Sequence, residues 1–239
     1  MINLVLYTYK SRASTCIKER KPQGMTEQSA PHHRELTLGI LALQGAYEAH
    51  ARTLADFRVA IRLIRTPDQL FAPDGRPSID GLIIPGGEST TMLKFLERNG
   101  FLDILIALIQ TIPTFGTCAG AILLATDVQN PTQISLGALD ITIERNAYGR
   151  QLDSTIVTVP TKLPGDPLEM VFIRAPRITR TGPQVETLAT RDDFPVLVRQ
   201  GHLLAATFHP ELGHDPRVHQ LFLDLVRDHA GLASSNVSP

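Results

Sequence analysis

A cysteine between two glycines is the residue whose type and setting most clearly suggest chemistry. Cys118 lies in Gly116-Thr117-Cys118-Ala119-Gly120, after an apolar, β-favouring run and before a helical pattern of small residues. A sharp strand-to-helix turn of this kind holds a nucleophile at strained backbone angles, and Cβ atoms at the flanking glycines would clash there. Backbone N–H groups at the helix start favour an anionic sulfur. The pattern indicates a nucleophile elbow, with a small buried core cysteine as the alternative.

A cysteine nucleophile needs a general base, and one of the eight histidines is well placed to be it. His209 follows an apolar run at a strand end, where α/β sheets place catalytic loops. Glu211 lies two residues further on, so its carboxylate could accept from one imidazole nitrogen while the other faces Cys118. The alternative is a strand-end histidine beside a solvated glutamate. Together with the elbow, the pattern indicates a triad of Cys118, His209 and Glu211.

A glycine-rich turn, Gly86-Gly87-Glu88-Ser89, follows another buried apolar run and precedes a helical pattern. Backbone N–H groups at such a turn can stabilise a tetrahedral oxyanion, together with the N–H of Ala119. We therefore expect Gly86, Gly87 and Ala119 to form an oxyanion hole. A dinucleotide or phosphate loop is the rival, but Gly-x-Gly-x-x-Gly and Gly-Lys-Ser/Thr are missing, and a plain βα turn is the structural alternative.

The other histidines indicate neither a metal site nor a second catalytic group. His214 and His219 are five residues apart, which does not place both on one helix face, and we expect both at solvated surface positions. His50 and His229 are typical of ordinary helix residues. Because His-Glu-x-x-His and Cys-x-x-Cys are missing, we expect no zinc, and no cofactor is indicated.

These residues need a scaffold of alternating strands and helices, which the first half of the folded region predicts. Continuous apolar runs are typical of parallel strands buried on both faces. The runs that predict strands and helices are 38–43, 47–57, 59–64, 81–85 and 90–110, the last broken near Asn99-Gly100. The expected fold class is α/β, a doubly wound and mostly parallel sheet flanked by helices.

The C-terminal half of the sequence has a different hydrophobic pattern. After residue 127, short β-like runs are separated by Pro and Gly, and these predict antiparallel strands added to the core sheet. They are 139–143, 155–159, 170–173, 184–190, 196–199 and 203–208. An amphipathic helix over 218–229 closes the domain.

Length and composition suit one medium α/β domain. The 239 residues are 43% hydrophobic and 20% charged, and the net charge of −1 gives no electrostatic case for nucleic acid or an anionic membrane. No apolar run approaches the roughly 18–20 residues that span a bilayer. The two cysteines do not form a disulfide framework, so we expect a reducing, cytoplasmic location.

The ends of the sequence differ from the domain, which we place at 36–231. Residues 1–35 are basic and then polar, and we expect a disordered extension or a mis-assigned start, with Met25 as the true initiator. An organelle-targeting segment is the alternative. Residues 232–239 are polar and predict a disordered tail.

As an ordered set, motifs between about residues 37 and 230 resemble the class I (triad) glutamine amidotransferases. The elbow and the His-x-Glu unit carry this broad resemblance. A narrower one, to the PdxT family of glutaminase subunits of pyridoxal 5′-phosphate synthase, rests on longer stretches. These are 43–46, 85–92, 116–120, 144–151, 172–176 and 208–212. The resemblance implies a flavodoxin-like fold.

The resemblance also implies roles. Cys118 attacks the side-chain amide of L-glutamine, forming a γ-glutamyl thioester and releasing ammonia, while His209 is general base and then acid, and Glu211 orients it. A cationic side chain and backbone polar groups suit an α-amino acid. The implied glutamine-binding residues are Gly87, Glu88, Ser89, Arg145, Ile173 and Arg174.

A partner is implied in the same way. In this family the ammonia passes to a separate synthase subunit, a (β/α)₈ barrel that activates the glutaminase, with twelve copies of each in the complex. Gln44 and Gly45 are candidate interface positions. Two positions depart modestly from the family pattern: Ala121 replaces a bulkier residue, and Gly213 stands where Thr or Ser is common.

Two other functions remain open from the sequence. One is a stand-alone thiol hydrolase of γ-glutamyl substrates, which would need no partner. The other is a non-enzymatic interaction module that retains an elbow cysteine.

Overall fold

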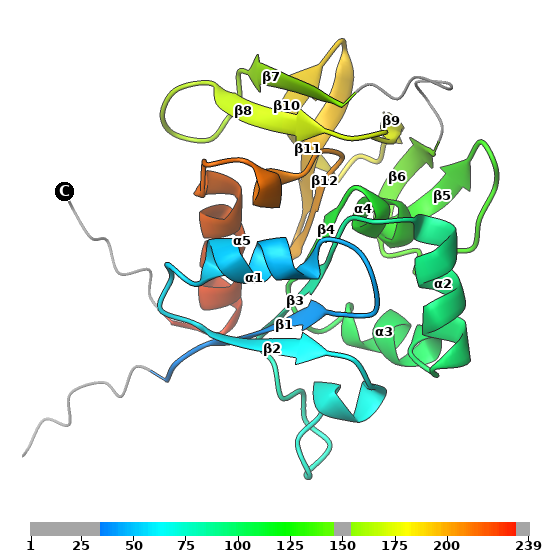
Figure 1. Ribbon diagram of the computed structural model, residues 1–239, viewed down its shortest axis with the longest axis vertical. Helices are drawn as coiled ribbons and strands as arrows, with labels where there is room; N and C mark the ends of the chain where they lie inside the picture. The colour runs from blue at the N-terminus through cyan, green and yellow to red at the C-terminus, as the bar shows by residue number, and fades with distance from the viewer. Residues whose placement is uncertain (1–33, 146–153, 233–239) are drawn as a thin grey trace, which may run out of the picture. The chain divides into compact units, whose positions relative to one another are not determined.

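A seven-stranded sheet runs through the described part of the computed structural model, residues 34–145 and 154–232 (Figure 1). Its strand order is β10-β11-β12-β4-β3-β1-β2, and the five strands from β12 to β2 pair in parallel. The antiparallel strands β10 and β11 extend one edge. The bounds are β1 Thr37–Leu41, β2 Ala60–Ile64, β3 Gly81–Ile84, β4 Thr114–Thr117, β10 Glu186–Arg191, β11 Phe194–Gln200 and β12 Leu203–Ala206.

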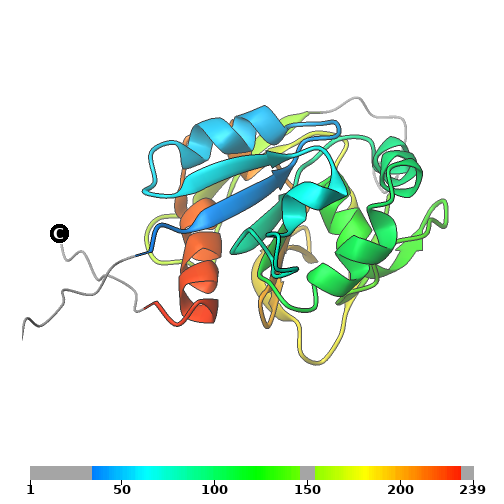
Figure 2. The ribbon, with the colours of Figure 1, turned by 90° about the horizontal axis from the view of Figure 1, so that it is seen from below.

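Helices cover both faces of this sheet (Figure 2). Helices α1 and α5 pack on one face, and α2, α3 and α4 on the other. Their bounds are α1 Tyr47–Leu54, α2 Ser89–Arg98, α3 Leu102–Leu108, α4 Ala119–Leu124 and α5 Arg217–His229, with 3-10 turns η1 Pro67–Leu70 and η2 Pro210–Leu212. The expected α/β class and the break between α2 and α3 are confirmed.

Strand β3 explains why the central strands are continuous apolar runs. Ile83 packs with the residues of α1 and α5, whereas Leu82 and Ile84 pack with those of α2, α3 and α4. All three side chains are fully buried. Since successive side chains of a strand point to opposite faces, a sheet covered twice needs apolar residues at every position.

The C-terminal half is more divided than the sequence predicts. Three of its strands, β10, β11 and β12, belong to the large sheet, and β12 pairs in parallel with β4 rather than only antiparallel as expected. The other strands form a three-stranded sheet, β5-β6-β9, and a β7-β8 hairpin. Their bounds are β5 Ala125–Gln129, β6 Leu139–Glu144, β7 Thr155–Val159, β8 Leu168–Phe172 and β9 Arg177–Thr181. The expectation had missed β5 and β9, because β9 buries only Ile178 and β5 is mostly exposed.

The strand register brings the sequence motifs together. Ile84 of β3 pairs with Gly116 of β4, and Thr117 of β4 pairs with Ala206 of β12. Because these strands are parallel, the loops that follow them meet at one edge of the sheet, where doubly wound folds bind ligands. The glycine-rich turn, the elbow and His209 all lie on these loops.

Some expectations lie outside the described residues. These concern the extension over residues 1–33, the motif residues 146–151 and the tail after residue 232. Within the described ranges, no helix is long and apolar enough to cross a membrane.

Candidate active site

Cys118 occupies the strand-to-helix turn that its neighbours predict. Its φ of 46° and ψ of −100° are strained for a residue with a side chain, and its N–H donates to the carbonyl of Ala206 at 2.8 Å. A Cβ on Gly120 would lie 2.0 Å from the oxygen of Ile84, and one on Gly116 would lie 2.6 Å from the carbonyl carbon of Gly120. The two glycines therefore let α4 start close against β3 and β4.

His209 and Glu211 lie beside the elbow. The carboxylate Oε1 of Glu211 accepts from Nδ1 of His209 at 2.7 Å, which leaves Nε2 for Cys118. All three side chains are buried, and the backbone N–H of His209 donates to the carbonyl of Val171 in β8 at 2.8 Å. The geometry is that of a nucleophile, a base and a carboxylate that orients the base.

The electrostatics favour an ion pair in this cluster. Burial opposes a charged imidazole, but hydrogen bonds to Cys118 and Glu211 outweigh it and raise the pKa of His209 to about 10. Burial also opposes ionisation of Glu211, but His50 and the hydrogen bond from His209 lower the pKa of its carboxyl group. An imidazolium between two acidic groups is the expected state near neutral pH.

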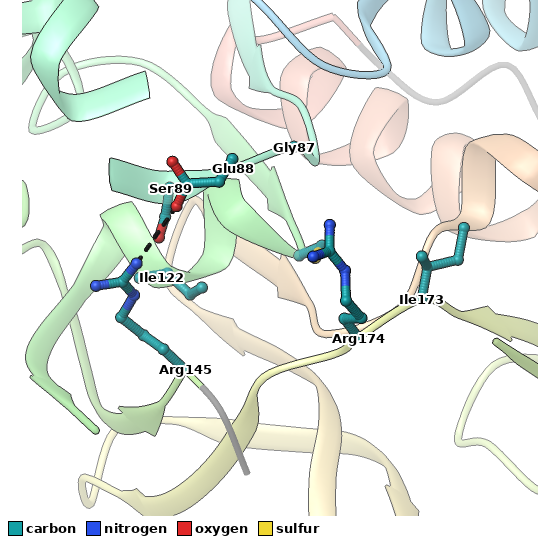
Figure 3. A pocket seen from close by; sticks show the side chains of 8 residues that line it. Gly87, Glu88, Ser89, Ile122, Arg145, Ile173 and Arg174 are labelled. Atoms are coloured by element: carbon teal, nitrogen blue, oxygen red, sulfur yellow. Dashed lines mark hydrogen bonds and ion pairs between the residues drawn. The ribbon is translucent and has the colours of Figure 1, made fainter. Parts of the chain in front are cut away.

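A pocket of about 120 Å³ opens in front of Cys118 (Figure 3). Drug-sized ligands occupy roughly 300–1,000 Å³, so this space suits a smaller molecule such as an amino acid. The pocket brings together the elbow cysteine and all six residues expected to bind glutamine. Its lining is Gly87, Glu88, Ser89, Cys118, Ile122, Arg145, Ile173 and Arg174. Ile122 is the one member that the sequence did not suggest.

Glu88 has a structural role at one wall of the pocket. Its carboxylate caps α2 by accepting from the N–H groups of Thr90 and Thr91 at 3.0 and 2.6 Å. Burial opposes ionisation, but the Thr91 hydroxyl and these two N–H groups lower the pKa of Glu88 to about 2. The guanidinium of Arg145 lies 3.4 Å from this carboxylate (Figure 3). It also donates to the Thr90 hydroxyl at 2.6 Å.

The turn that carries Gly86 and Gly87 is packed against both the triad and Gln44. A Cβ on Gly86 would lie 2.4 Å from Cε1 of His209, so only glycine fits there. The Gln44 amide donates to the carbonyl of Glu88 at 3.0 Å and accepts from its N–H at 3.4 Å. Gln44, expected at a partner interface, therefore also holds this turn in place.

Two buried histidines behind the triad escaped the sequence analysis. His219 was expected at the surface, which is wrong, because its side chain is fully buried, as is that of His50. A signal was present: His219 shares one face of α5 with Phe222, Leu223 and Val226, all buried. A histidine on the apolar stripe of a helix is buried with that stripe.

Fold and comparisons together define the class, a glutamine amidotransferase on a mostly parallel α/β sheet. The chain belongs to the SNO glutamine amidotransferase family, whose model matches residues 40–228. A crystal structure of a glutamine amidotransferase superposes with a TM-score of 0.70 at 41% identity, covering 79% of this chain and 98% of that chain.

Two similar curated proteins share one name within this class. The pyridoxal 5′-phosphate synthase subunit PdxT of Koribacter versatilis is 54% identical over 193 residues, which cover 81% of this chain and 97% of that protein. The subunit of the same name from Thermotoga sp. strain RQ2 is 47% identical over 195 residues, covering 80% of this chain and 100% of that protein. The resemblance that the motifs indicated is confirmed.

Proposed function

We propose that this chain is the glutaminase subunit of a pyridoxal 5′-phosphate synthase, hydrolysing L-glutamine to L-glutamate and ammonia for use by a synthase subunit. The supporting observation is the buried His209–Glu211 pair, joined at 2.7 Å beside the elbow Cys118, in front of an amino-acid-sized pocket. The high identity to subunits named PdxT supports the same assignment.

The chemistry follows from this geometry. The Cys118 sulfur attacks the side-chain amide carbon of glutamine, and the resulting oxyanion accepts hydrogen bonds from N–H groups of the Gly86-Gly87 turn and Ala119. His209 gives its proton to the leaving nitrogen, so ammonia departs and a γ-glutamyl thioester remains. His209 then takes a proton from water as the water attacks the thioester carbonyl, and the Cys118 thiolate leaves, which releases glutamate and restores the ion pair with the His209 imidazolium. Glu211 holds the imidazole in the orientation for both steps.

The lining of the pocket offers groups that suit both the charged end and the carbon chain of glutamine. The two arginines, Arg145 and Arg174, are the cations available for the substrate's α-carboxylate. Glu88, which lies beside Arg145, together with Ser89 and the Gly87 backbone supplies further polar groups, and Ile173 adds an apolar contact to the carbon chain.

The partner is a synthase subunit that consumes the ammonia. We propose that it is a (β/α)₈ barrel, with twelve copies of each subunit, in line with the family resemblance. The reaction belongs in the cytoplasm, because Cys118 must stay a free thiol and a reducing compartment keeps it so.

The test is ammonia release from glutamine by the chain mixed with its synthase subunit. Cys118→Ala should abolish glutamine-dependent activity, by more than about 10³-fold, because it removes the nucleophile. Pyridoxal 5′-phosphate formation by the same mixture should return when ammonium salt replaces glutamine, since the synthase step needs no Cys118.

Two outcomes would contradict the proposal. Glutamine hydrolysis at the parent rate by the Cys118→Ala variant would exclude the thioester mechanism. Efficient cleavage of γ-glutamyl peptides by the isolated chain, with no gain from the synthase subunit, would favour the stand-alone hydrolase instead.

A further inference from the structure

Two fully buried histidines, on different helices, meet behind the triad. Nδ1 of His50 in α1 lies 3.0 Å from Nε2 of His219 in α5. The other nitrogen of His50, Nε2, lies 3.1 Å from the hydroxyl of Thr117, the residue before the nucleophile. Neither histidine lines the pocket in front of Cys118. Both are therefore outside the machinery described so far, although they contact it.

Glu211 connects this pair to the triad. Its Oε1 accepts from His209, whereas its Oε2 is buried and has no hydrogen-bond partner among the described residues. Nε2 of His50 lies 3.5 Å from that Oε2, and both side chains are fully excluded from solvent. A buried carboxylate oxygen without a donor is costly, so a proton on this particular nitrogen has a strong electrostatic reason to be there.

The ring protons can be assigned from these contacts. Burial lowers the pKa of His50, and lowers that of His219 to about 3, so each ring is neutral and carries one N–H. With the proton of His50 on Nε2, it points at Thr117 and Glu211, and Nδ1 accepts from Nε2–H of His219. Nδ1 of His219, which has no partner, is then a bare acceptor.

The opposite tautomer is worse at both ends. It would aim the Nε2 lone pair of His50 at the Glu211 carboxylate, and it would leave a buried N–H on Nδ1 of His219 without an acceptor. A buried N–H without an acceptor costs free energy, and so does a lone pair aimed at a carboxylate. The ring of Phe115 also contacts His50 edge-on and carries no charge, and His209 is a further titratable group close enough to lower the pKa of His50.

We propose that His50 is a positioning residue of the active site: its Nε2–H holds the Glu211 carboxylate against His209, and His219 fixes the tautomer of His50. The relay then runs from Cys118 through His209 and Glu211 to His50 and His219. The inference rests on the proposed triad. It adds a hydrogen-bond donor from α1 and, from α5, a group that sets the tautomer of that donor. The two helices are far apart in the sequence but adjacent in the fold.

The first experiment compares two variants of His50 in the complex with the synthase subunit. In His50→Gln the amide nitrogen takes the place of Nε2 and keeps a donor toward Glu211, whereas His50→Leu removes it. His50→Leu should lower kcat for glutamine about tenfold, equal to about 1.4 kcal/mol, with KM changed by less than about twofold. His50→Gln should recover most of kcat.

A pH profile separates positioning from packing. As the pH is raised, inactivation by a glutamine-analogue electrophile should begin to slow at a lower pH in His50→Leu than in the parent. A less firmly held Glu211 stabilises the His209 imidazolium less, which lowers the pKa of His209. His202→Gln is the matched control, since it removes a histidine that bonds the carbonyl of Ile109 at the other end of β12. It should leave kcat and the profile unchanged.

A spectroscopic test needs no variant. Long-range ¹H–¹⁵N correlation spectra of the unmodified protein should place the His50 proton on Nε2 and the His219 proton on Nε2. A proton on Nδ1 of His50 would overturn the proposal, as would equal kcat and equal pH profiles in His50→Leu and His50→Gln. If His50→Leu does not fold, this spectrum and the kcat of His50→Gln decide.

Failure of this inference is distinguishable from failure of the proposed function. An inactive Cys118→Ala with an unaffected His50→Leu would remove only the positioning role. A fully active Cys118→Ala would remove the triad itself.

Discussion

At the scale of single residues, strain and function coincide in the pocket. Arg174 has a φ of 43°, in the left-handed region that favours glycine, and it lines the same pocket as Cys118, whose φ is 46°. Non-glycine residues held there cost of the order of 1 kcal/mol or more, and such strain gathers at functional sites. The side chain of Arg174 is exposed, and the proposed contact with glutamine would give this strained residue a function.

Replacing Arg174 by glycine should therefore increase the stability of the domain and weaken its binding of glutamine. We expect Arg174→Gly to raise the free energy of unfolding by about 0.5–1 kcal/mol, because glycine relaxes the backbone strain. The KM for glutamine should rise about tenfold or more, because a charge-assisted hydrogen bond is lost. Urea unfolding and glutaminase kinetics in the complex measure the two effects.

The matched control for this variant is Asp193→Gly. Asp193 has a φ of 66° in the turn between β10 and β11, away from the pocket. It should gain stability in the same way with no change in KM. An unchanged KM in Arg174→Gly would show that this arginine does not bind glutamine.

At the scale of elements, the site depends on how closely α4 approaches the sheet. Gly120 lies over β3, where an added Cβ would meet the backbone oxygen of Ile84 at 2.0 Å. Backbone cannot rotate away as a long side chain can, so a larger residue must push α4 off the strand. Because α4 begins directly after Cys118, that movement would displace the nucleophile from His209.

Gly120→Ala should consequently lose both stability and rate. Overpacking costs about 1–3 kcal/mol, and a nucleophile displaced by about 1 Å can lose roughly 100-fold in rate. Thermal unfolding and kcat for glutamine test this. Gly213→Ala is the comparison, since its nearest contact would be an ordinary 3.8 Å to the Pro210 oxygen. If Gly120→Ala matched it in both measurements, close approach of α4 would not govern the site.

At the scale of the whole folded domain, three buried histidines make the free energy of unfolding depend on pH. His50 and His219 act in one direction and His209 in the other. Burial lowers the pKa of His50 and of His219, so the unfolded chain binds more protons than the native state below about pH 6.5. Stability therefore falls as the pH drops from about 6.5. The pKa of His209 is raised to about 10, so its contribution is present below about 6.5 and is lost as the pH rises through 10.

The free energy of unfolding should accordingly be highest near pH 6.5. Each buried neutral histidine contributes a slope of up to about 1.4 kcal/mol per pH unit on the acid side. His219→Gln should reduce that acid slope by about 1.4 kcal/mol per pH unit, because one buried neutral histidine is removed. Urea unfolding at a series of pH values between 4 and 7, spaced roughly evenly, measures the slope. Identical slopes in the parent and His219→Gln would mean that His219 is not held neutral.

Features that depend on residues close together in the chain could be predicted from the sequence alone. The elbow could be predicted because its steric demands fall on Gly116 and Gly120, two residues either side of Cys118. The His209–Glu211 pair was predictable because a single proline, Pro210, separates the donor from its acceptor and limits the distance between them. The central sheet was predictable because strands covered on both faces must be apolar throughout.

The contacts that the apolar faces of α1 and α5 make could be found only in the folded structure. Helical periodicity shows that a side chain is buried, but it does not identify the partner on another element. His50 and His219 are 169 residues apart and meet because both helices pack on the same face of the sheet. The division of the C-terminal strands into two small sheets was equally hidden, since half-exposed strands such as β5 and β9 carry a weak pattern. The residues that support the triad from behind therefore follow from packing, whereas the triad itself follows from local chemistry.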